Sequence, residues 1–164
     1  LDAPYQLVYG TVSDFVPPDD SRVLARGQYV PISGMNLCFQ RDFAPLAYFP
    51  LQGDGWPYRR FDDIWFGVIA KKACDHLGWS ISMGRPSVRH IRASDVYQNL
   101  VKEAPGIGFN EHFWRVIDAI ELTGCGTPCD CMRRIGESLA ERESCYLQSL
   151  GVALGTWAEL FPGC

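Results

Sequence analysis

Two adjacent carboxylates stand between a glycine-rich loop and a segment with helical periodicity. Asp62 and Asp63 follow Arg60 closely, and the loop before them holds Asp54 between two glycines. Carboxylates placed in this way can accept hydrogen bonds from sugar hydroxyls, act as a general base, or hold a divalent cation. The structural alternative is helix capping, because acidic side chains favour the positive end of a helix. Trp65, at the start of the same segment, can stack on a ligand or pack in the core.

Two further positions could contribute to such a site. Asn36 lies in an extended stretch beside Gly34, where the missing side chain would let a ligand or another backbone approach. His90 stands near the end of a short predicted strand, flanked by Arg89 and Arg92. A neutral imidazole there could complete a metal site begun elsewhere, or be a hydrogen-bonded structural residue.

The cysteines form a third group. There are seven, an odd number, so at least one is unpaired within the chain. Cys125, Cys129 and Cys131 are the only cluster in the sequence, and no histidine lies near them. Structural zinc sites usually take two pairs of ligands, so reduced thiols at a helix start are the alternative. The overall usage favours a reducing compartment over a disulfide framework.

Periodicity and helix-breaking residues predict the elements that must position these groups. Residues 1–28 are predicted to be rich in loops, and residues 29–40 to be extended. A long helix is predicted over 62–77, with Gly78 as the left-handed residue that ends it. Two short strands follow, and then four helices, the first of which ends before Pro105 because proline breaks a helix. The strands are 79–83 and 87–91, and the helices are 94–104, 110–122, one beginning at Thr127-Pro128, and 146–160.

Composition limits the classes of protein to which the chain can belong. Its 164 residues are 47% hydrophobic and 13% aromatic, enough to build a core, so disorder is excluded. A net charge of −4 argues against a nucleic-acid partner, which needs clustered Lys and Arg. The longest apolar run, residues 64–70, is far shorter than the roughly 20 residues that cross a bilayer. The usual motifs of dinucleotide binding, P-loops, serine hydrolases and zinc proteases do not occur.

A series of short motifs, in a fixed order along the chain, resembles the pattern of one known family. The motifs are Asp2-Ala3-Pro4 with Gln6-Leu7-Val8, Gly34-Met35-Asn36-Leu37 with Phe39 and Arg41, Gly53-Asp54-Gly55 with Pro57, Arg60-Phe61-Asp62-Asp63-Ile64-Trp65, Cys74-Asp75-His76-Leu77, His90 with Ala93-Ser94, and Asn99-Leu100 with Lys102-Glu103. This order is similar to that of the reversibly glycosylated polypeptide family of plants and algae, whose members include UDP-arabinopyranose mutases. The resemblance is dense over residues 1–107, and beyond them only helical character and Trp157-Ala158-Glu159-Leu160 look similar.

The resemblance implies a mixed α/β fold. It is that of nucleotide-sugar glycosyltransferases of the A type, of which residues 1–107 would form the C-terminal part. Residues 108–164 would be a helical extension packed on it. The family's Asp-x-Asp metal motif, its uridine-binding strands and its glycosylated arginine would lie upstream of the matched region, and no Asp-x-Asp occurs here. The chain would therefore supply one wall of a divided site.

The resemblance also implies an activity. It is the interconversion of UDP-arabinopyranose and UDP-arabinofuranose for cell-wall or glycan polysaccharide synthesis, with self-glycosylation and with Mn²⁺ or Mg²⁺ as cofactor. By this resemblance, Asp62 and Asp63 are the expected catalytic residues and His90 the expected metal ligand. The expected substrate-binding residues are Asn36, Asp54, Arg60 and Trp65. Two alternatives stay open: transfer of a sugar from a UDP-sugar to an acceptor, and a non-catalytic partner subunit.

Partners and location follow from the same resemblance. We expect a UDP-sugar as ligand and homo- or hetero-oligomers with family members. From the net charge and the length of the apolar runs, no nucleic acid and no membrane span are expected. The expected location is the cytosol, with peripheral attachment to the cytosolic face of the Golgi as a further expectation.

Overall fold

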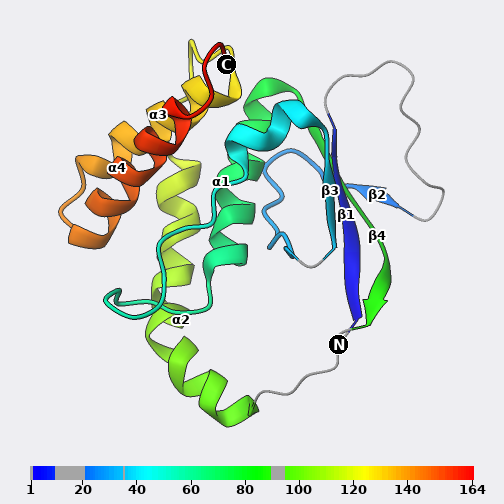
Figure 1. Cartoon of the computed structure of the whole chain (residues 1–164), viewed down its shortest axis with the longest axis vertical. Helices are drawn as coiled ribbons and strands as arrows, with labels where there is room; N and C mark the ends of the chain where they lie inside the picture. The colour runs from blue at the N-terminus through cyan, green and yellow to red at the C-terminus, as the bar shows by residue number, and fades with distance from the viewer. Residues whose placement is uncertain (1, 10–20, 35, 90–94) are drawn as a thin grey trace.

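A four-stranded sheet lies on one side of the molecule, and the helices lie on the other (Figure 1). The computed structural model describes residues 2–9, 21–34, 36–89 and 95–164, with the backbone alone for residues 2–9 and 85–89. Within these residues the fold is mixed α/β and mostly helical, as the sequence predicted at the level of class.

The sheet brings together strands from the first half of the chain. They are β1 (Asp2–Tyr9), β2 (Arg22–Val23), β3 (Leu37–Phe39) and β4 (Ser80–Arg89), in the order β2-β4-β1-β3. β1 pairs with β3 in parallel and with β4 in antiparallel fashion, so that Val8 lies opposite both Phe39 and Ile81. The segment 1–28, predicted to be rich in loops, contains the strands β1 and β2. In the described part of the segment 29–40, predicted to be extended, residues 37–39 form β3. The prediction of two strands after Gly78 was wrong, because the single strand β4 covers the described residues of both.

α1 (Asp62–Leu77) is the central helix, with the predicted bounds. Gly78 ends it with a left-handed φ of 72°, as its sequence position predicted. The predicted cap was wrong: the N-cap residue is Phe61, no side chain caps this end, and Asp62 and Asp63 lie in the first turn. α1 contacts β4, the next helix α2 and the later helix α3, and so connects the sheet to the helices.

α2 (Val96–Asp118) is one helix of 23 residues where the sequence predicted two. The Asp95 side chain caps its start by accepting hydrogen bonds from two backbone N–H groups, so the predicted beginning was right. The predicted end before Pro105 was wrong, because the helix continues through this proline. Gly106 has no side chain and lies against the ring of Phe61, where an added Cβ would come within 3 Å of ring atoms. The boundary expected between residues 107 and 108 falls inside this helix.

α3 (Pro128–Ala140) and α4 (Cys145–Glu159) form a close pair at the end of the molecule away from the sheet (Figure 1). Thr127 caps α3 and Pro128 is its first residue, as predicted. The two helices approach closely because Gly136 and Gly151 face each other; a Cβ on Gly136 would lie 2.7 Å from the Gly151 carbonyl oxygen. A 3₁₀ helix, η1 (Arg41–Leu46), packs against α3.

The cysteines differ from the expectation of reduced thiols. Cys129 and Cys164 form a disulfide, while Cys38, Cys74, Cys125, Cys131 and Cys145 are free. Sequence spacing could not predict the pair, because its members lie 35 residues apart. In the described part of the chain, no helix combines the length and the apolar character needed to cross a membrane.

Candidate functional site

A cavity of about 390 Å³ lies at the N-terminal end of α1. It collects residues from four parts of the fold: the segment before β3, the start of α1, β4 and α2. Its lining consists of Pro31, Ser33, Arg60, Phe61, Asp63, Ile64, Met83 and Glu103. We call it the Arg60 cavity. Of the predicted site residues, it brings together Arg60 and Asp63.

Close backbone packing shapes this cavity. Gly67 lies in α1 against the segment 30–32, where a Cβ would be 2.6 Å from the Ile32 nitrogen and closer still to the Val30 carbonyl oxygen. The Ile32 N–H donates to the Asp63 carbonyl oxygen at 3.4 Å. Only glycine permits this approach, so Gly67 fixes one wall of the cavity against α1.

Arg60 adopts a backbone conformation that is unusual for its residue type. Its φ is 67°, and it is the single non-glycine residue with positive φ among the described residues. Its Nε lies 2.7 Å from Oε1 of Glu103, and the two side chains are 42% and 33% exposed. A non-glycine residue in the left-handed region costs free energy, and such residues gather at functional sites. The ion pair thus holds the guanidinium of Arg60 next to Glu103, and both residues line the cavity.

Asp63 is the half-buried carboxyl of the cavity. Burial raises its pKa, and the negative charge of Asp62 raises it further. A hydrogen bond from the Ile64 N–H and the nearby Arg60 charge lower it, but they do not reverse the shift. The raised pKa distinguishes the environment of Asp63 from that of a carboxylate in water. Asp62 is also half-buried, but it is not among the residues that line the cavity.

Trp65 supports this region from inside the core. It has no exposed surface, so it presents none to a ligand in this structure. Its ring stacks on Phe61 and Phe113 at centroid distances of 5.3 and 4.8 Å. The indole N–H donates to Oδ1 of Asn110 at 3.0 Å. Trp65 therefore positions the start of α1 through packing.

The remaining predicted residues lie apart from the cavity. The Asp54 side chain is 95% exposed on its loop and pairs with Arg59 at 2.7 Å. Asn36 is half-buried, and its N–H donates to the carbonyl oxygen of Ser33, a lining residue, at 3.5 Å. His90 lies outside the described residues.

A second cavity of about 360 Å³ adjoins the first and shares Pro31 and Ile64 with it. Tyr29 and Trp114 form an aromatic wall there, with ring centroids 6.2 Å apart. The Tyr29 hydroxyl donates to Oδ1 of Asp118 at 2.6 Å, and burial raises its pKa, so it stays protonated.

Sequence reasoning missed Glu103, Ser33 and this aromatic wall as parts of the site. For Glu103 a signal was present, because it closes the Asn99-Leu100 motif of the family resemblance. Nothing in that motif indicated a partner 43 positions earlier in the chain.

The described residues do not form a ligand set for a divalent cation. They hold no group of three or more His, Cys, Asp or Glu side chains placed to bind a metal. In the Arg60 cavity the Glu103 carboxylate is already paired with a guanidinium. Hard cations need several free oxygen ligands, so these residues alone do not fit Mn²⁺ or Mg²⁺.

Comparison with known proteins decides the family. The model of the family described as reversibly glycosylated polypeptide matches residues 1–163. The chain belongs to the reversibly glycosylated polypeptide family. Because the match continues to residue 163, the expectation that the resemblance fades after residue 107 was wrong: the helical part belongs to the family as well.

Curated relatives agree with this assignment. The chain is 37% identical to "Probable UDP-arabinopyranose mutase 1" of Solanum tuberosum and 36% identical to "UDP-arabinopyranose mutase 1" of Arabidopsis thaliana. It is 34% identical to "UDP-arabinopyranose mutase 3" of the latter species. Each comparison covers 96% of this chain and about 45% of the relative. The chain therefore spans a little under half the length of these relatives.

Proposed function

We propose that the chain forms one wall of a UDP-sugar site that interconverts UDP-arabinopyranose and UDP-arabinofuranose. The observation that carries the proposal is the Arg60 cavity, where Glu103 holds a guanidinium next to a half-buried carboxyl. Its 390 Å³ falls within the roughly 300–1,000 Å³ typical of small-molecule sites. Family membership supports the choice of substrate class.

Each side chain has a role that suits its surroundings. The Arg60 guanidinium binds diphosphate oxygens, since its planar donors match phosphate geometry. The Asp63 carboxylate stabilises the positive charge that develops at the anomeric carbon as the bond to phosphate breaks. Glu103 is a positioning residue that acts through Arg60. Asp62 sets the charge next to Asp63, while Asn36 and Asp54 remain proposed sugar contacts on neighbouring segments.

The finer predictions belong to the same proposal. Residues 1–107 would be part of an A-type glycosyltransferase fold, and residues 108–164 a helical extension. His90 would be a ligand of a divalent cation. The described residues do not form a ligand set for that cation, so none of the roles given above depends on the metal. Assembly with family members and a cytosolic location with peripheral attachment to the Golgi complete the proposal.

A chromatographic assay tests the reaction. UDP-arabinofuranose is incubated, with and without Mn²⁺, with the 164-residue chain together with the part of a family member that lies upstream of the matched region, and the two ring forms are separated. We expect conversion to the pyranose form, a loss of at least tenfold in Asp63→Asn, and no change in Glu137→Gln, which removes a carboxylate that is 70% exposed on α3. If sugar is incorporated only when an acceptor is added, the proposed mutase activity is wrong and the activity is that of a glycosyltransferase. If the chain shows no conversion and no UDP binding but associates stably with a full-length relative, the chain is a non-catalytic partner subunit.

A further inference from the structure

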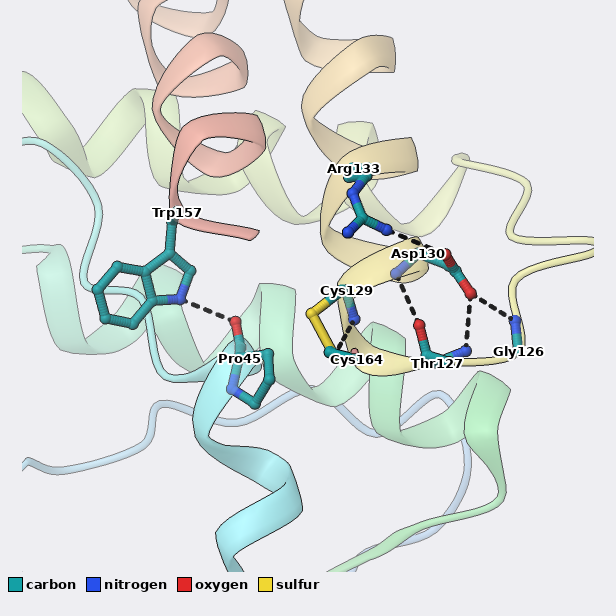
Figure 2. The surroundings of a disulfide bond; sticks show 8 residues. All are labelled: Pro45, Gly126, Thr127, Cys129, Asp130, Arg133, Trp157 and Cys164. Carbon is teal, nitrogen blue, oxygen red and sulfur yellow. Dashed lines mark hydrogen bonds and ion pairs between the residues drawn. A yellow bond between two sulfur atoms is a disulfide. The ribbon is translucent and has the colours of Figure 1, made fainter. Parts of the chain in front are cut away.

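The disulfide between Cys129 and Cys164 ties two distant parts of the helical region together. Cys129 lies in the first turn of α3, and Cys164 follows the end of α4 (Figure 2). Next to it, the Trp157 indole N–H donates to the Pro45 carbonyl oxygen at 2.9 Å, which holds the end of α4 on η1. The segment 161–164 is thus anchored at both of its ends.

The two sulfur-bearing residues differ in accessibility. Cys129 has no exposed surface, whereas Cys164 is partly exposed. Cys164 also lines a cavity of about 670 Å³ together with Trp79, Thr127 and Phe161. Thiol–disulfide exchange requires a thiolate to reach one of the two sulfur atoms. Of the two residues, Cys164 is therefore the one that an external thiolate would approach, with the sulfur of Cys129 as the leaving group.

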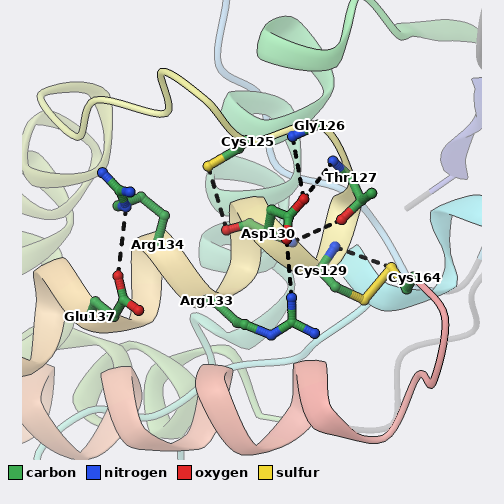
Figure 3. A network of polar contacts seen from close by, with 9 residues as sticks. All are labelled: Cys125, Gly126, Thr127, Cys129, Asp130, Arg133, Arg134, Glu137 and Cys164. Carbon is green, nitrogen blue, oxygen red and sulfur yellow. Dashed lines mark hydrogen bonds and ion pairs between the residues drawn. A yellow bond between two sulfur atoms is a disulfide. The ribbon is translucent and has the colours of Figure 1, made fainter.

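The surroundings of Cys129 favour its departure as a thiolate. It lies in the first turn of α3, where the helix dipole favours negative charge. The Cys129 N–H already donates to the Cys164 sulfur at 3.2 Å. The negative charge of the nearby Asp130 carboxylate is balanced by its own partners. It accepts hydrogen bonds from the N–H groups of Gly126 and Thr127 and pairs with Arg133 at 3.1 Å (Figure 3).

The neighbouring free thiols do not compete. Cys74 is fully buried, and burial raises its pKa strongly. Burial and the nearby Cys125 raise the pKa of Cys131 to about 12. Cys125 donates to the Asp130 carbonyl oxygen at 3.6 Å. Buried thiols with raised pKa values are poor nucleophiles, so Cys74 and Cys131 do not attack the disulfide.

We infer that Cys129 and Cys164 form a reversible thiol-exchange site for low-molecular-weight thiols of the glutathione class. In the first step a thiolate RS⁻ bonds to Cys164 Sγ, the Cys129–Cys164 bond breaks, and Cys129 leaves as a thiolate that takes up a proton. In the second step another RS⁻ attacks the outer sulfur of the mixed disulfide, forming RSSR and releasing the Cys164 thiolate. Two RSH are oxidised and one disulfide is reduced. Disulfides in reducing compartments are commonly transient in this way.

Reduction releases a defined segment. In the oxidised chain, the other contacts of residues 161–164 are local: the Phe161 and Trp157 rings lie 5.2 Å apart between centroids, and the Cys164 N–H donates to the Phe161 carbonyl oxygen. The Trp157 bond to Pro45 still holds α4 itself. The segment that forms one wall of the 670 Å³ cavity becomes mobile, and the cavity opens towards Trp79 and Thr127.

Peptide mapping tests the site of exchange. The oxidised chain is incubated in buffers of graded reduced and oxidised glutathione, quenched in acid, alkylated and digested. We expect a glutathione adduct on Cys164 at intermediate ratios, paired alkylation of Cys129 and Cys164 at high thiol, and recovery of the bond with oxidised glutathione. Cys145→Ser, which removes an exposed free thiol, should give the same pattern. An adduct on Cys129, or a bond that resists glutathione until the chain unfolds, would overturn the proposal.

Hydrogen exchange tests the release of the segment. Reduced protein and the variant Cys164→Ser should both exchange the amides of Phe161 and residue 164 at least tenfold faster than oxidised protein, in which the N–H groups of Phe161 and Cys164 donate to carbonyl oxygens. Protection of α4 up to Trp157 should be unchanged, which shows that the variant remains folded. Equal exchange in the oxidised and reduced chains would contradict the release of the segment.

Discussion

The left-handed backbone at Arg60 allows a sharp test of the geometry of the proposed site. A residue with a Cβ pays roughly 1–2 kcal/mol in this region, whereas glycine pays none. In ordinary backbone conformations, glycine lowers the free energy of unfolding by about 0.5–1 kcal/mol relative to alanine, because it loses more conformational entropy on folding. With φ at 67°, Arg60→Gly should therefore be more stable than Arg60→Ala by about 0.5–1 kcal/mol, which reverses the usual order of the two residues.

The two variants are a matched pair because each loses the ion pair with Glu103. That pair is partly exposed, at 42% and 33%, so its loss contributes about 0–1 kcal/mol and cancels in the comparison. Urea unfolding of both variants measures the difference directly. In thermal unfolding, 0.5–1 kcal/mol corresponds to roughly 1–4 °C for a chain of this size. Equal stability, or greater stability of Arg60→Ala, would refute the strained conformation on which the site rests.

Three further predictions concern the framework of the site and the helical end. Gly67→Ala should lower the free energy of unfolding by about 1–3 kcal/mol, because its Cβ would collide with the backbone at Val30; urea unfolding at an unchanged m-value checks this. The raised pKa of Asp63 means that the folded state binds its proton more tightly than the unfolded state. The stability advantage of wild type over Asp63→Asn should therefore shrink as the pH rises from about 4 to 7, and a growing advantage would contradict the shift. Thr127→Ala should cost about 1 kcal/mol in thermal unfolding by removing the cap of α3, whereas Thr127→Ser should retain most of it.

Local signals in the sequence predicted the elements that local chemistry determines. The bounds of α1 followed from apolar periodicity and Gly78, and the start of α3 followed from Thr127 and Pro128. The predicted break at Pro105 was wrong because tertiary contact overrides propensity here. Gly106 packs against the ring of Phe61, which holds this part of the helix in place. Pro105 has no N–H to donate to the Val101 carbonyl oxygen, but Val101 is 70% exposed, so water can hydrate that oxygen.

Long-range pairings set the limit of what the sequence could predict about the site. Arg60 and Asp63, which are close in sequence, both line the Arg60 cavity, while their roles in binding and catalysis stay predictions. Glu103 and the disulfide were missed because each depends on how α2 and α4 pack. Trp65 was open to two readings, and its position depends on a ring cluster that forms only in the folded chain.

Calorimetric titration of UDP-arabinopyranose into the chain tests whether the Arg60 cavity binds a nucleotide sugar. We expect wild type to bind it and Arg60→Ala to weaken binding at least tenfold. Arg134→Ala, which removes a half-exposed guanidinium on α3, should bind as wild type does. Equal weakening in both variants would show that general positive charge, and not the Arg60 cavity, holds the ligand. Equal binding by wild type and Arg60→Ala would contradict the account.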